Sequence, residues 1–450
     1  MSKVRPISGF PEWLPSERIV EQHFLDVIRE TFELHGFASI QTRAVEPIER
    51  LSSQGEDTDK EIYAISRLAG GLDDSRESRE SRLGLHFDLT VPFARYVLEN
   101  AGKLTFPFRR YQIQPVWRGE RPQDGRYREF TQCDIDIVNV GELAPHYEAE
   151  LPLVIADAFS KLPIGPFRIQ VNNRKIPQGF YLGIGLTDVQ AMLRIVDKLD
   201  KIGPQRVCEL MVAAGATAEQ ATAALALAEI SAPDDSFVAQ VQALGVEHDL
   251  LTQGLAELAA VIRVGSEHAP GLMVADLKVA RGLDYYTGTV YETQLIGLES
   301  YGSICSGGRY DALASDGRTT YPGVGISIGL SRLLAKIMPT LSASRSTPSC
   351  VLVSLAAETD RAAGMRVAAA LRQRGIPCEV SPLAAKFGKQ IQFAQRRGIP
   401  FVWFPASGDH SDDSDQSSDS VKDIRSGDQA KADASSWRPP ADDQWPRVIG

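Results

Sequence analysis

Two stretches in which polar and apolar residues alternate, separated by a turn-rich segment, constrain the fold of this chain more than any other feature. The stretches are Tyr111–Arg118 and Arg128–Ile137, and the segment between them contains Pro122 and Asp124 followed by glycine. Alternation with period two is typical of β-strands, and short Pro-, Asp- and Gly-containing segments reverse the chain. The sequence therefore predicts a β-hairpin and, with a similar stretch at Phe167–Val171, an antiparallel sheet.

The hairpin has one polar face. On its second strand Arg128, Phe130, Gln132, Asp134 and Asp136 share one side, and Cys133, Ile135 and Ile137 share the other. Between positions 109 and 128 six arginines stand against two acidic residues, although the whole chain has a formal charge of −10. Overall charge excludes a protein that binds nucleic acid through a general positive surface, so a polyanion would bind this local basic patch. A solvated hairpin held by salt bridges is the alternative.

The segment LHFDLTVPFARY also alternates, which predicts a strand over residues 85–90 with His86, Asp88 and Thr90 on one face. A carboxylate beside a hydroxyl group can hold an ammonium group. The alternative is that Asp88 is a turn or cap residue.

Three further segments carry candidate site residues. Arg281 precedes the pair Tyr285 and Tyr286 in RGLDYYTG, and Tyr310 lies in SGGRYDAL. The segment GVGISIGLSRLL has a glycine spacing that lacks the Rossmann pattern and leads into a helix that contains Arg332. Arg332 is a candidate phosphate ligand or a surface salt-bridge residue, and the tyrosine pair is a candidate for the ligand site or the core.

The remaining sequence suggests about three domains for 450 residues. A helix is expected from Ser16, a plausible N-cap, to Gly36, and residues 180–265 are Ala-rich with helical periodicity, which indicates a helical insertion. After a polar linker at 342–349, strand and helix alternate, which predicts a small α/β domain with parallel strands. Residues 405–420 hold five aspartates and six serines and are expected to form a disordered acidic loop. Calcium binding is the alternative there, but the EF-hand spacing is missing.

Cysteine spacing and hydropathy exclude several classes of protein. The five cysteines are odd in number and never spaced as C-x-x-C, so neither a disulfide framework nor a thiolate metal site is expected. No apolar run approaches the roughly 18 residues that a membrane span needs, and the N-terminus does not resemble a signal peptide. We therefore expect a cytoplasmic protein without a membrane partner.

Taken in order, these segments resemble class II aminoacyl-tRNA synthetases, specifically the histidyl-tRNA synthetase family, over nearly the whole chain. Arg118–Asp136 is similar to the second motif of that class and GVGISIGLSRLL to its third, while RGLDYYTG and SGGRYD resemble the histidine-specific signatures. The resemblance implies an α+β catalytic domain at 1–345 with a six-stranded antiparallel sheet. It also implies an insertion at 180–265 that approaches the tRNA acceptor stem, and a C-terminal α/β domain at 346–450 that reads the anticodon.

The resemblance also implies an activity and its partners. The family joins L-histidine to ATP as histidyl-adenylate and then transfers histidine to its tRNA. Mg²⁺ is expected to accompany ATP, no metal site of the protein's own is expected, and the enzyme is expected to be a homodimer. Gln41-Thr42-Arg43 stands where the first motif, at the dimer interface, usually has Thr-Pro, and His86 stands where relatives commonly carry arginine.

By position, the resemblance assigns each candidate residue a role. Arg118 would contact the α-phosphate, Arg332 the γ-phosphate, and Arg281 would lie between the α-phosphate and the attacking carboxylate, so that these three are catalytic and Arg118 and Arg281 contact both substrates. The other ATP-binding residues are Glu120, Arg126 and Phe130, of which Phe130 stacks on adenine. Histidine would be held by its amino group at Asp88, Leu89, Thr90 and Gln132, and by its imidazole at Asp136, Tyr285, Tyr286 and Tyr310.

Two rival functions come from other classes. One is the histidine-sensing regulatory subunit of ATP phosphoribosyltransferase, which keeps the catalytic fold but lacks the anticodon domain. The other is a tRNA-sensing module that accompanies a kinase, although no kinase motif is present here. Amino-acid-dependent pyrophosphate exchange discriminates a synthetase from both.

Overall fold

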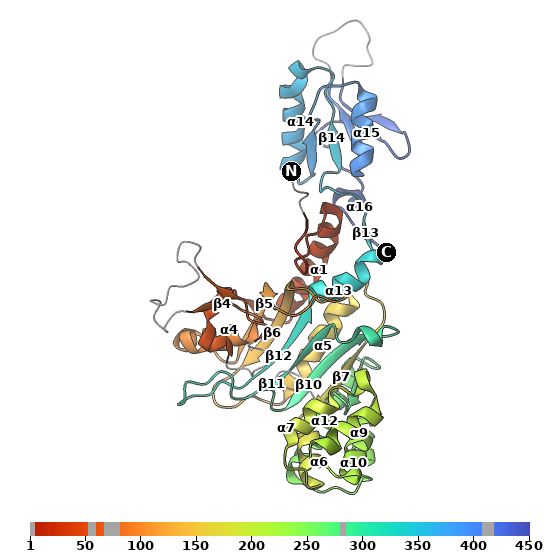
Figure 1. Ribbon diagram of the computed structural model, residues 1–450. Coiled ribbons are helices and arrows are strands. Elements are labelled where there is room, and N and C mark those ends of the chain that lie inside the picture. Colours follow the sequence, from red (N-terminus) through yellow and green to blue (C-terminus); the bar gives the residue numbers. More distant parts are fainter. Residues whose placement is uncertain (1–4, 53–59, 67–81, 280–284, 407–417) are drawn as a thin grey trace, which may run out of the picture. The chain divides into compact units, whose positions relative to one another are not determined.

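The computed structural model describes residues 5–52, 60–66, 82–279, 285–406 and 418–450 (Figure 1). The chain divides into two compact units. Met1–Pro11 and Asp26–Lys336 form the first unit, and Glu12–Leu25 and Ile337–Gly450 form the second. Among the described residues, no helix is both long enough and apolar enough to cross a membrane.

A mixed nine-stranded sheet forms the centre of the first unit (Figure 1). In spatial order its strands are β1 (Ala38–Ser39), β5 (Phe108–Trp117), β6 (Glu129–Val138), β12 (Gly323–Gly329), β11 (Cys305–Tyr310), β10 (Thr289–Leu295), β7 (Phe167–Asn173), β9 (Met273–Asp276) and β8 (Ser231–Ala232). This corrects the expected six-stranded antiparallel sheet. The strands from β5 to β7 in this order do pair antiparallel, but β1 pairs parallel with β5 and β9 parallel with β7. The added strands have two to four residues, too few to show an alternating pattern.

The first unit also contains a small sheet and further helices. The small sheet contains β2 (Val45–Pro47), β4 (Leu83–Leu85) and β3 (Ala64–Ile65); the helices are α2 (Ile48–Leu51), α4 (Thr90–Asn100), η3 (Ala101–Lys103), α5 (His146–Ser160), η4 (Glu299–Tyr301) and most of α13 (Leu330–Ile337). Helix α1 (Pro15–Leu34) is divided between the two units at Leu25. The predicted strand over residues 85–90 is wrong. The strand ends at Leu85 and α4 begins at Thr90, because Asp88 accepts a hydrogen bond from the Val91 N–H at 3.2 Å in the first turn of the helix.

The apolar face of the sheet packs on α5. Ile135 and Ile137 of β6 and Val171 of β7 are fully buried on this face, and the Tyr291 hydroxyl donates to the backbone carbonyl of Glu148 on α5. Helix α5 is itself apolar on most sides, which conceals the helical periodicity that would have predicted it. This packing leaves the opposite, polar face of the strands available for a site.

Helices fill the sequence between β7 and β9. They are α6 (Lys175–Gly183), α7 (Val189–Val196), α8 (Leu199–Ile202), α9 (Pro204–Ala213), α10 (Ala218–Ala228), α11 (Phe237–Gln242) and α12 (Asp249–His268). Local signals define their ends. Thr217 and Gln220 form a reciprocal capping box at the start of α10, and the His248 ring accepts from the Leu250 N–H at the start of α12.

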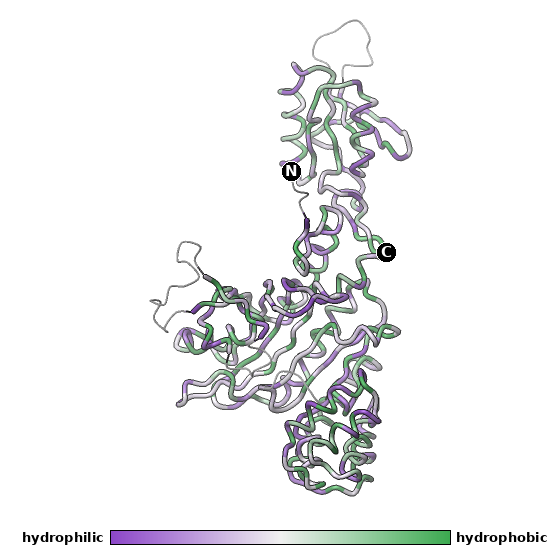
Figure 2. The backbone as a smooth tube through the Cα atoms, viewed as in Figure 1, coloured by the Kyte–Doolittle hydropathy of each residue, from purple (hydrophilic) through white to green (hydrophobic). Residues whose placement is uncertain are grey.

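The second unit contains a five-stranded sheet. Its strands, in spatial order, are β15 (Cys378–Val380), β14 (Val351–Val353), β16 (Phe401–Phe404), β17 (Ser420–Asp423) and β18 (Gln429–Lys431). The first three are parallel, and β17 and β18 extend the sheet antiparallel. The other elements are η5 (Met338–Thr340), β13 (Ser342–Ala343), η6 (Glu358–Asp360), α14 (Arg361–Gln373), α15 (Phe387–Arg397), α16 (Ala441–Gln444) and β19 (Val448–Ile449). Strand β14 is hydrophobic along its length, whereas hydrophilic residues recur along α14 and α15 (Figure 2).

The described ends of the predicted acidic loop, residues 405–406 and 418–420, contain a structural residue. The Asp419 carboxylate accepts hydrogen bonds from Nε1 of the fully buried Trp403 at 2.9 Å and from the Ala406 N–H at 2.7 Å. Ser420 begins β17, and residues 407–417 lie outside the described residues. Asp419 therefore joins two neighbouring strands of the second unit.

We expect Asp419→Ala to lower the free energy of unfolding of the second unit by about 1–3 kcal/mol, because it leaves the Trp403 N–H buried without an acceptor. Urea unfolding followed by tryptophan fluorescence measures this loss. The matched control is Asp412→Ala, which removes the same charge from the same acidic run. Equal stability of the two variants would contradict the structural role of Asp419.

Candidate active site

The strand part of the hairpin's polar face is buried, whereas its turn segment is exposed and carries the Arg126–Glu120 salt bridge. Asp134 and Asp136 are each only 2% exposed, and Gln132 is 9% exposed. On β12, Ser327 lies opposite Asp134 and Gly325 lies opposite Asp136. Charged side chains that are covered in this way need compensating partners or a ligand.

Glycines on β11 and β12 make room for the larger side chains of this face. A Cβ atom at Gly325 would lie 2.0 Å from Oδ1 of Asp136, and one at Gly323 would lie 2.5 Å from the Tyr310 ring. Only glycine lets the backbone of β12 approach these side chains so closely.

One arginine, which the sequence analysis did not select, is central to the site. Arg110 of β5 is fully buried, and its Nη2 lies 2.6 Å from Oδ2 of Asp136. The Tyr310 hydroxyl donates to Oδ1 of the same carboxylate at 2.7 Å. Arg110 could have been found by register, since the residue that pairs with Asp136 across the hairpin lies on the same face.

Three carboxyl groups share this environment. Burial raises the pKa of Asp134 to about 7 and that of Asp136 to about 6, although the positive charge of Arg110 opposes both shifts. Burial also raises the pKa of Asp88 to about 6, against the Val91 N–H and the charges of Arg118 and Arg110. The described part of the site therefore holds more buried acidic groups than its arginines compensate, which favours a ligand with hydrogen-bond donors or positive charge.

Residues of the sheet face, Thr90 of α4 and Tyr286 line a small pocket. It is lined by Thr90, Asp134, Asp136, Tyr286, Tyr310, Gly325, Ile326 and Ser327. Tyr285 lies beside it, with its ring centroid 4.9 Å from that of Tyr286 and 6.1 Å from that of Tyr310. The fully buried Leu89 immediately precedes α4. The structure thus brings together the residues predicted to hold the imidazole and one of those predicted to hold the amino group.

Several buried polar atoms of this region have no hydrogen-bond partner among the described residues. The acceptors are Oδ2 of Asp88, Oε1 of Gln132 and Oδ1 of Asp134, and the donors include Nε of Arg110. Buried polar groups in proteins are almost always hydrogen-bonded. Of these residues only Asp134 lines the pocket, and its free acceptor is consistent with a polar ligand that supplies a donor.

Arg118 and Phe130 lie together at the neighbouring part of the hairpin. The Arg118 guanidinium lies 5.1 Å from the Phe130 ring centroid, and its Nε donates to the Phe87 carbonyl at 3.0 Å. In the turn segment, Nη1 of Arg126 lies 3.4 Å from Oε2 of Glu120. A fixed guanidinium beside an aromatic ring suits a ligand that has both phosphate and a planar base.

Arg332 is held in place by the segment that precedes β11. Its Nε donates to the Ser303 carbonyl at 2.8 Å, and its guanidinium lies 4.3 Å from the centroid of the Tyr301 ring. Burial lowers the pKa of Arg332, and the nearby charges of Arg126 and Glu120 also act on it. The turn segment of the hairpin and α13 are therefore close. Arg281 lies outside the described residues.

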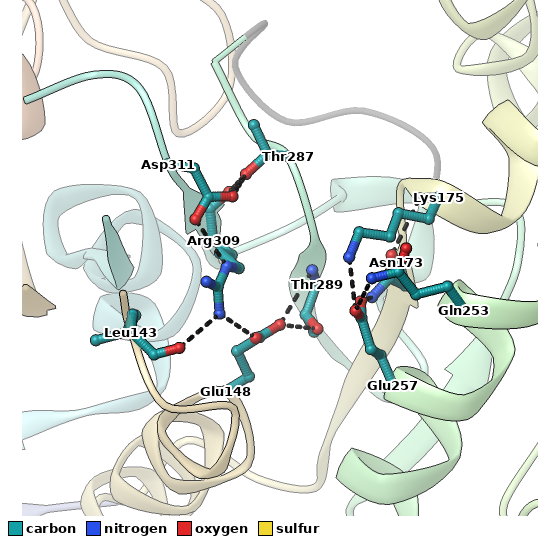
Figure 3. Close-up of polar contacts among 10 residues, drawn as sticks. All are labelled: Leu143, Glu148, Asn173, Lys175, Gln253, Glu257, Thr287, Thr289, Arg309 and Asp311. Atoms are coloured by element: carbon teal, nitrogen blue, oxygen red, sulfur yellow. Dashed lines mark hydrogen bonds and ion pairs between the residues drawn. The ribbon is translucent and has the colours of Figure 1, made fainter. Parts of the chain in front are cut away.

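Two groups of polar side chains, one around Glu148 and one around Glu257, hold the ends of strands of the large sheet in place (Figure 3). The Glu148 carboxylate, on α5, accepts hydrogen bonds from the Thr289 N–H at 3.3 Å and from Nη1 of Arg309 at 2.8 Å. The Glu257 carboxylate, on α12, accepts from Nδ2 of Asn173 at 2.8 Å. These carboxylates anchor the ends of β10, β11 and β7. No group of three or more His, Cys, Asp or Glu side chains in the described ranges is arranged to hold a metal ion.

Comparisons with known proteins identify the family of this chain. Residues 9–333 match the family model described as histidyl-tRNA synthetase. A histidine-tRNA ligase of Cutibacterium acnes is 59% identical, with 100% of both sequences aligned, and one of Micrococcus luteus is 58% identical over 100% of this chain and 99% of its own. The crystal structure of histidyl-tRNA synthetase from Nostoc sp. PCC 7120 superposes with a TM-score of 0.82 and 34% identity, covering 96% of this chain and 98% of that one. This chain therefore belongs to the histidyl-tRNA synthetase family.

Proposed function

We propose that this protein is a histidine-tRNA ligase. It joins L-histidine to ATP, accompanied by Mg²⁺, to give histidyl-adenylate and diphosphate, and then transfers histidine to the 3′ end of its tRNA. The observation that supports this most directly is the set of buried polar side chains on one face of the hairpin, where Asp134, Asp136 and Tyr310 line a small pocket and the Arg118 guanidinium lies against the Phe130 ring. The carboxyl and hydroxyl groups suit an amino acid with several donors, and the cation and ring suit ATP.

Histidine would be held through hydrogen bonds to buried acceptors of the site. Oδ2 of Asp88 and Oε1 of Gln132, with the Thr90 hydroxyl, would accept the three N–H donors of the α-ammonium group. The imidazole would lie toward Asp136 and Tyr310, with Tyr285 and Tyr286 against it. A buried site with paired hydrogen bonds rejects analogues that lack them by about 10⁴ to 10⁵, which suits an enzyme without an editing domain.

ATP would be held and activated by positively charged arginine side chains in fixed positions. The histidine carboxylate attacks the α-phosphorus in line with the departing diphosphate, so catalysis depends on positioning and on neutralising the phosphate oxygens. Arg118 would bind the α-phosphate, Phe130 would stack on adenine, and Arg332 would bind the γ-phosphate. Glu120 and Arg126 would complete the ATP site. Arg281 would stabilise the developing charge between carboxylate and α-phosphate.

The tRNA would bind through other parts of the chain. We assign residues 1–345 to catalysis, the helical region 180–265 to the acceptor stem and residues 346–450 to the anticodon, in a homodimer. The last region contains six cations that could contact tRNA phosphates: Arg372, Arg374, Lys386, Lys389, Arg396 and Arg397. Arg372 and Arg374 donate to backbone carbonyls and Arg397 pairs with Glu379 at 2.8 Å. The exposed Lys386, Lys389 and Arg396 are therefore the better candidates for phosphate contacts.

We expect Arg118→Ala to reduce histidine-dependent ATP–pyrophosphate exchange about a hundredfold or more, because it removes fixed charge from the reacting phosphate. Arg121→Ala, which removes an exposed arginine from the same turn segment, is the control and should keep near-normal exchange. Both variants should keep the wild-type melting temperature. Near-normal exchange by a folded Arg118→Ala protein would overturn the assignment of Arg118 to the α-phosphate. If the wild-type protein itself shows no exchange, a histidine-sensing regulatory protein becomes the favoured function.

We expect the double variant Lys389→Glu/Arg396→Glu to reduce tRNA charging at low salt by about tenfold or more while exchange stays unchanged. Each lost phosphate contact should also lower the slope of log affinity against log salt by roughly 0.7 to 0.9. Arg366→Glu, on α14 of the same unit, is the matched control because Arg366 is also exposed. If the double variant charges tRNA as the control does, α15 does not contact tRNA.

A further inference from the structure

Tyr301 lies between the two elements that carry proposed ATP-binding residues, namely α13 and the turn segment of the hairpin. Its ring centroid lies 4.3 Å from the guanidinium of Arg332, and its hydroxyl donates a hydrogen bond to the backbone carbonyl of Arg332 at 2.7 Å. The turn segment contacts the same hydroxyl, because a Cβ atom at Gly125 would overlap it. Tyr301 therefore contacts both elements at once.

The segment that carries Tyr301 also determines the orientation of the Arg332 side chain. Nε of Arg332 donates to the Ser303 carbonyl at 2.8 Å, and Nη2 donates to the carbonyl of Tyr301 itself. Both acceptors are uncharged, so they do not neutralise the guanidinium, which keeps its positive charge for a phosphate group. Neither bond uses Nη1, which can bind a phosphate oxygen directly.

Several positive charges lie close to the Tyr301 ring. Nζ of Lys336, one helical turn after Arg332 on α13, lies 5.2 Å from the ring centroid, and Arg126 is near enough for its charge to act on Arg332. Like charges repel one another, so a flexible arginine side chain would move away from this group of cations. The electron-rich face of the ring attracts the guanidinium and keeps it in place. Burial raises the pKa of Tyr301 to about 12, so its hydroxyl stays protonated and donates.

We infer that Tyr301 is a positioning residue for adenylate formation, which holds the Arg332 guanidinium at the place where the γ-phosphate of ATP binds. The inference rests on the proposed function, because it takes Arg332 as the ligand of the γ-phosphate. The ring and the hydroxyl of Tyr301 both contact Arg332, so Tyr301 acts through that residue and not on the substrate. A charge that is already in place needs no rearrangement when ATP binds, which strengthens its contact with the phosphate.

Two nucleotides separate this contact from the rest of the ATP site. ATP and ADP differ only in the γ-phosphate, so the ratio of their dissociation constants reports the contacts of that group. Effects on adenine, on ribose and on the inner phosphates cancel in the ratio. Titration calorimetry with the magnesium complexes of both nucleotides measures the ratio in the wild type and in variants.

We expect Tyr301→Leu, which removes the ring and the hydroxyl, to lower the preference for ATP over ADP about fivefold or more, while the Kd for ADP changes less than about twofold. Tyr301→Phe keeps the ring over the guanidinium but loses the hydrogen bond, and should lower the preference only about threefold. Tyr147→Leu removes another partly buried tyrosine, from α5, and is the matched control that should leave the preference unchanged.

A double-mutant cycle separates the positioning of Arg332 from a general effect on folding. Arg332→Ala should remove most of the preference for ATP over ADP. Adding Tyr301→Leu to this variant should then change the ratio less than about twofold, because the guanidinium through which Tyr301 acts is gone. If Tyr301→Leu does not fold, Tyr301→Phe takes its place in the cycle.

A drop of equal size with and without Arg332 would overturn the inference, as would an unchanged preference in a folded Tyr301 variant. An unchanged preference in Arg332→Ala would also overturn it, because Arg332 would then not bind the γ-phosphate. Failure of the proposed function is a separate outcome, in which the wild-type protein binds ATP but shows no histidine-dependent exchange.

Discussion

The buried ion pair between Arg110 and Asp136 is the interaction on which the rest of the polar sheet face depends. Its arginine is fully buried, and its charge acts on the carboxyl groups of Asp88, Asp134 and Asp136 together. Two buried acidic groups on this face and a third, Asp88, beside it would be costly without such a charge, because removing ionised carboxylates from water costs much free energy. A guanidinium suits this position because it stays charged when buried and its planar fork can contact several neighbours. Its plane also lies 4.3 Å from the centroid of the Phe93 ring, which covers it with apolar carbon.

The central strands serve two functions, one on each face. Ile135, Ile137 and Val171 bury against the side that carries α5, and this packing makes the sheet rigid. The side chains that alternate with them lie on the opposite, polar face. Helix α5 also supplies Glu148, whose carboxylate holds the ends of β10 and β11 through hydrogen bonds with Thr289 and Arg309. A rigid sheet that is fixed at its strand ends can hold a hydrogen-bonding site to the precision that discrimination between amino acids requires.

Sequence patterns predicted those elements in which the local preference for strand or helix agrees with the packing of the folded protein. The hairpin and the strand–helix alternation after residue 345 have clear periodicities. Residues 85–90 alternate as a strand would, yet Asp88 instead interacts with the first turn of a helix, and α5 is too apolar on all sides to show an amphipathic period. Motif resemblance selected Arg118, Phe130 and Tyr310. It did not select Arg110, because the partner of Asp136 is set by the register of the two strands and not by a local motif.

Close approach of β12 to Asp136 has a consequence for how this sequence can change over time. Any residue other than glycine at 325 would place its first side-chain carbon inside the space of the Asp136 carboxylate. An alanine at 325 would therefore force the Asp136 carboxylate away from Arg110 and Tyr310, unless Asp136 had first been exchanged for a smaller side chain. The two positions are thus linked by mutational order, and the pocket can drift only along paths that alter the carboxylate first.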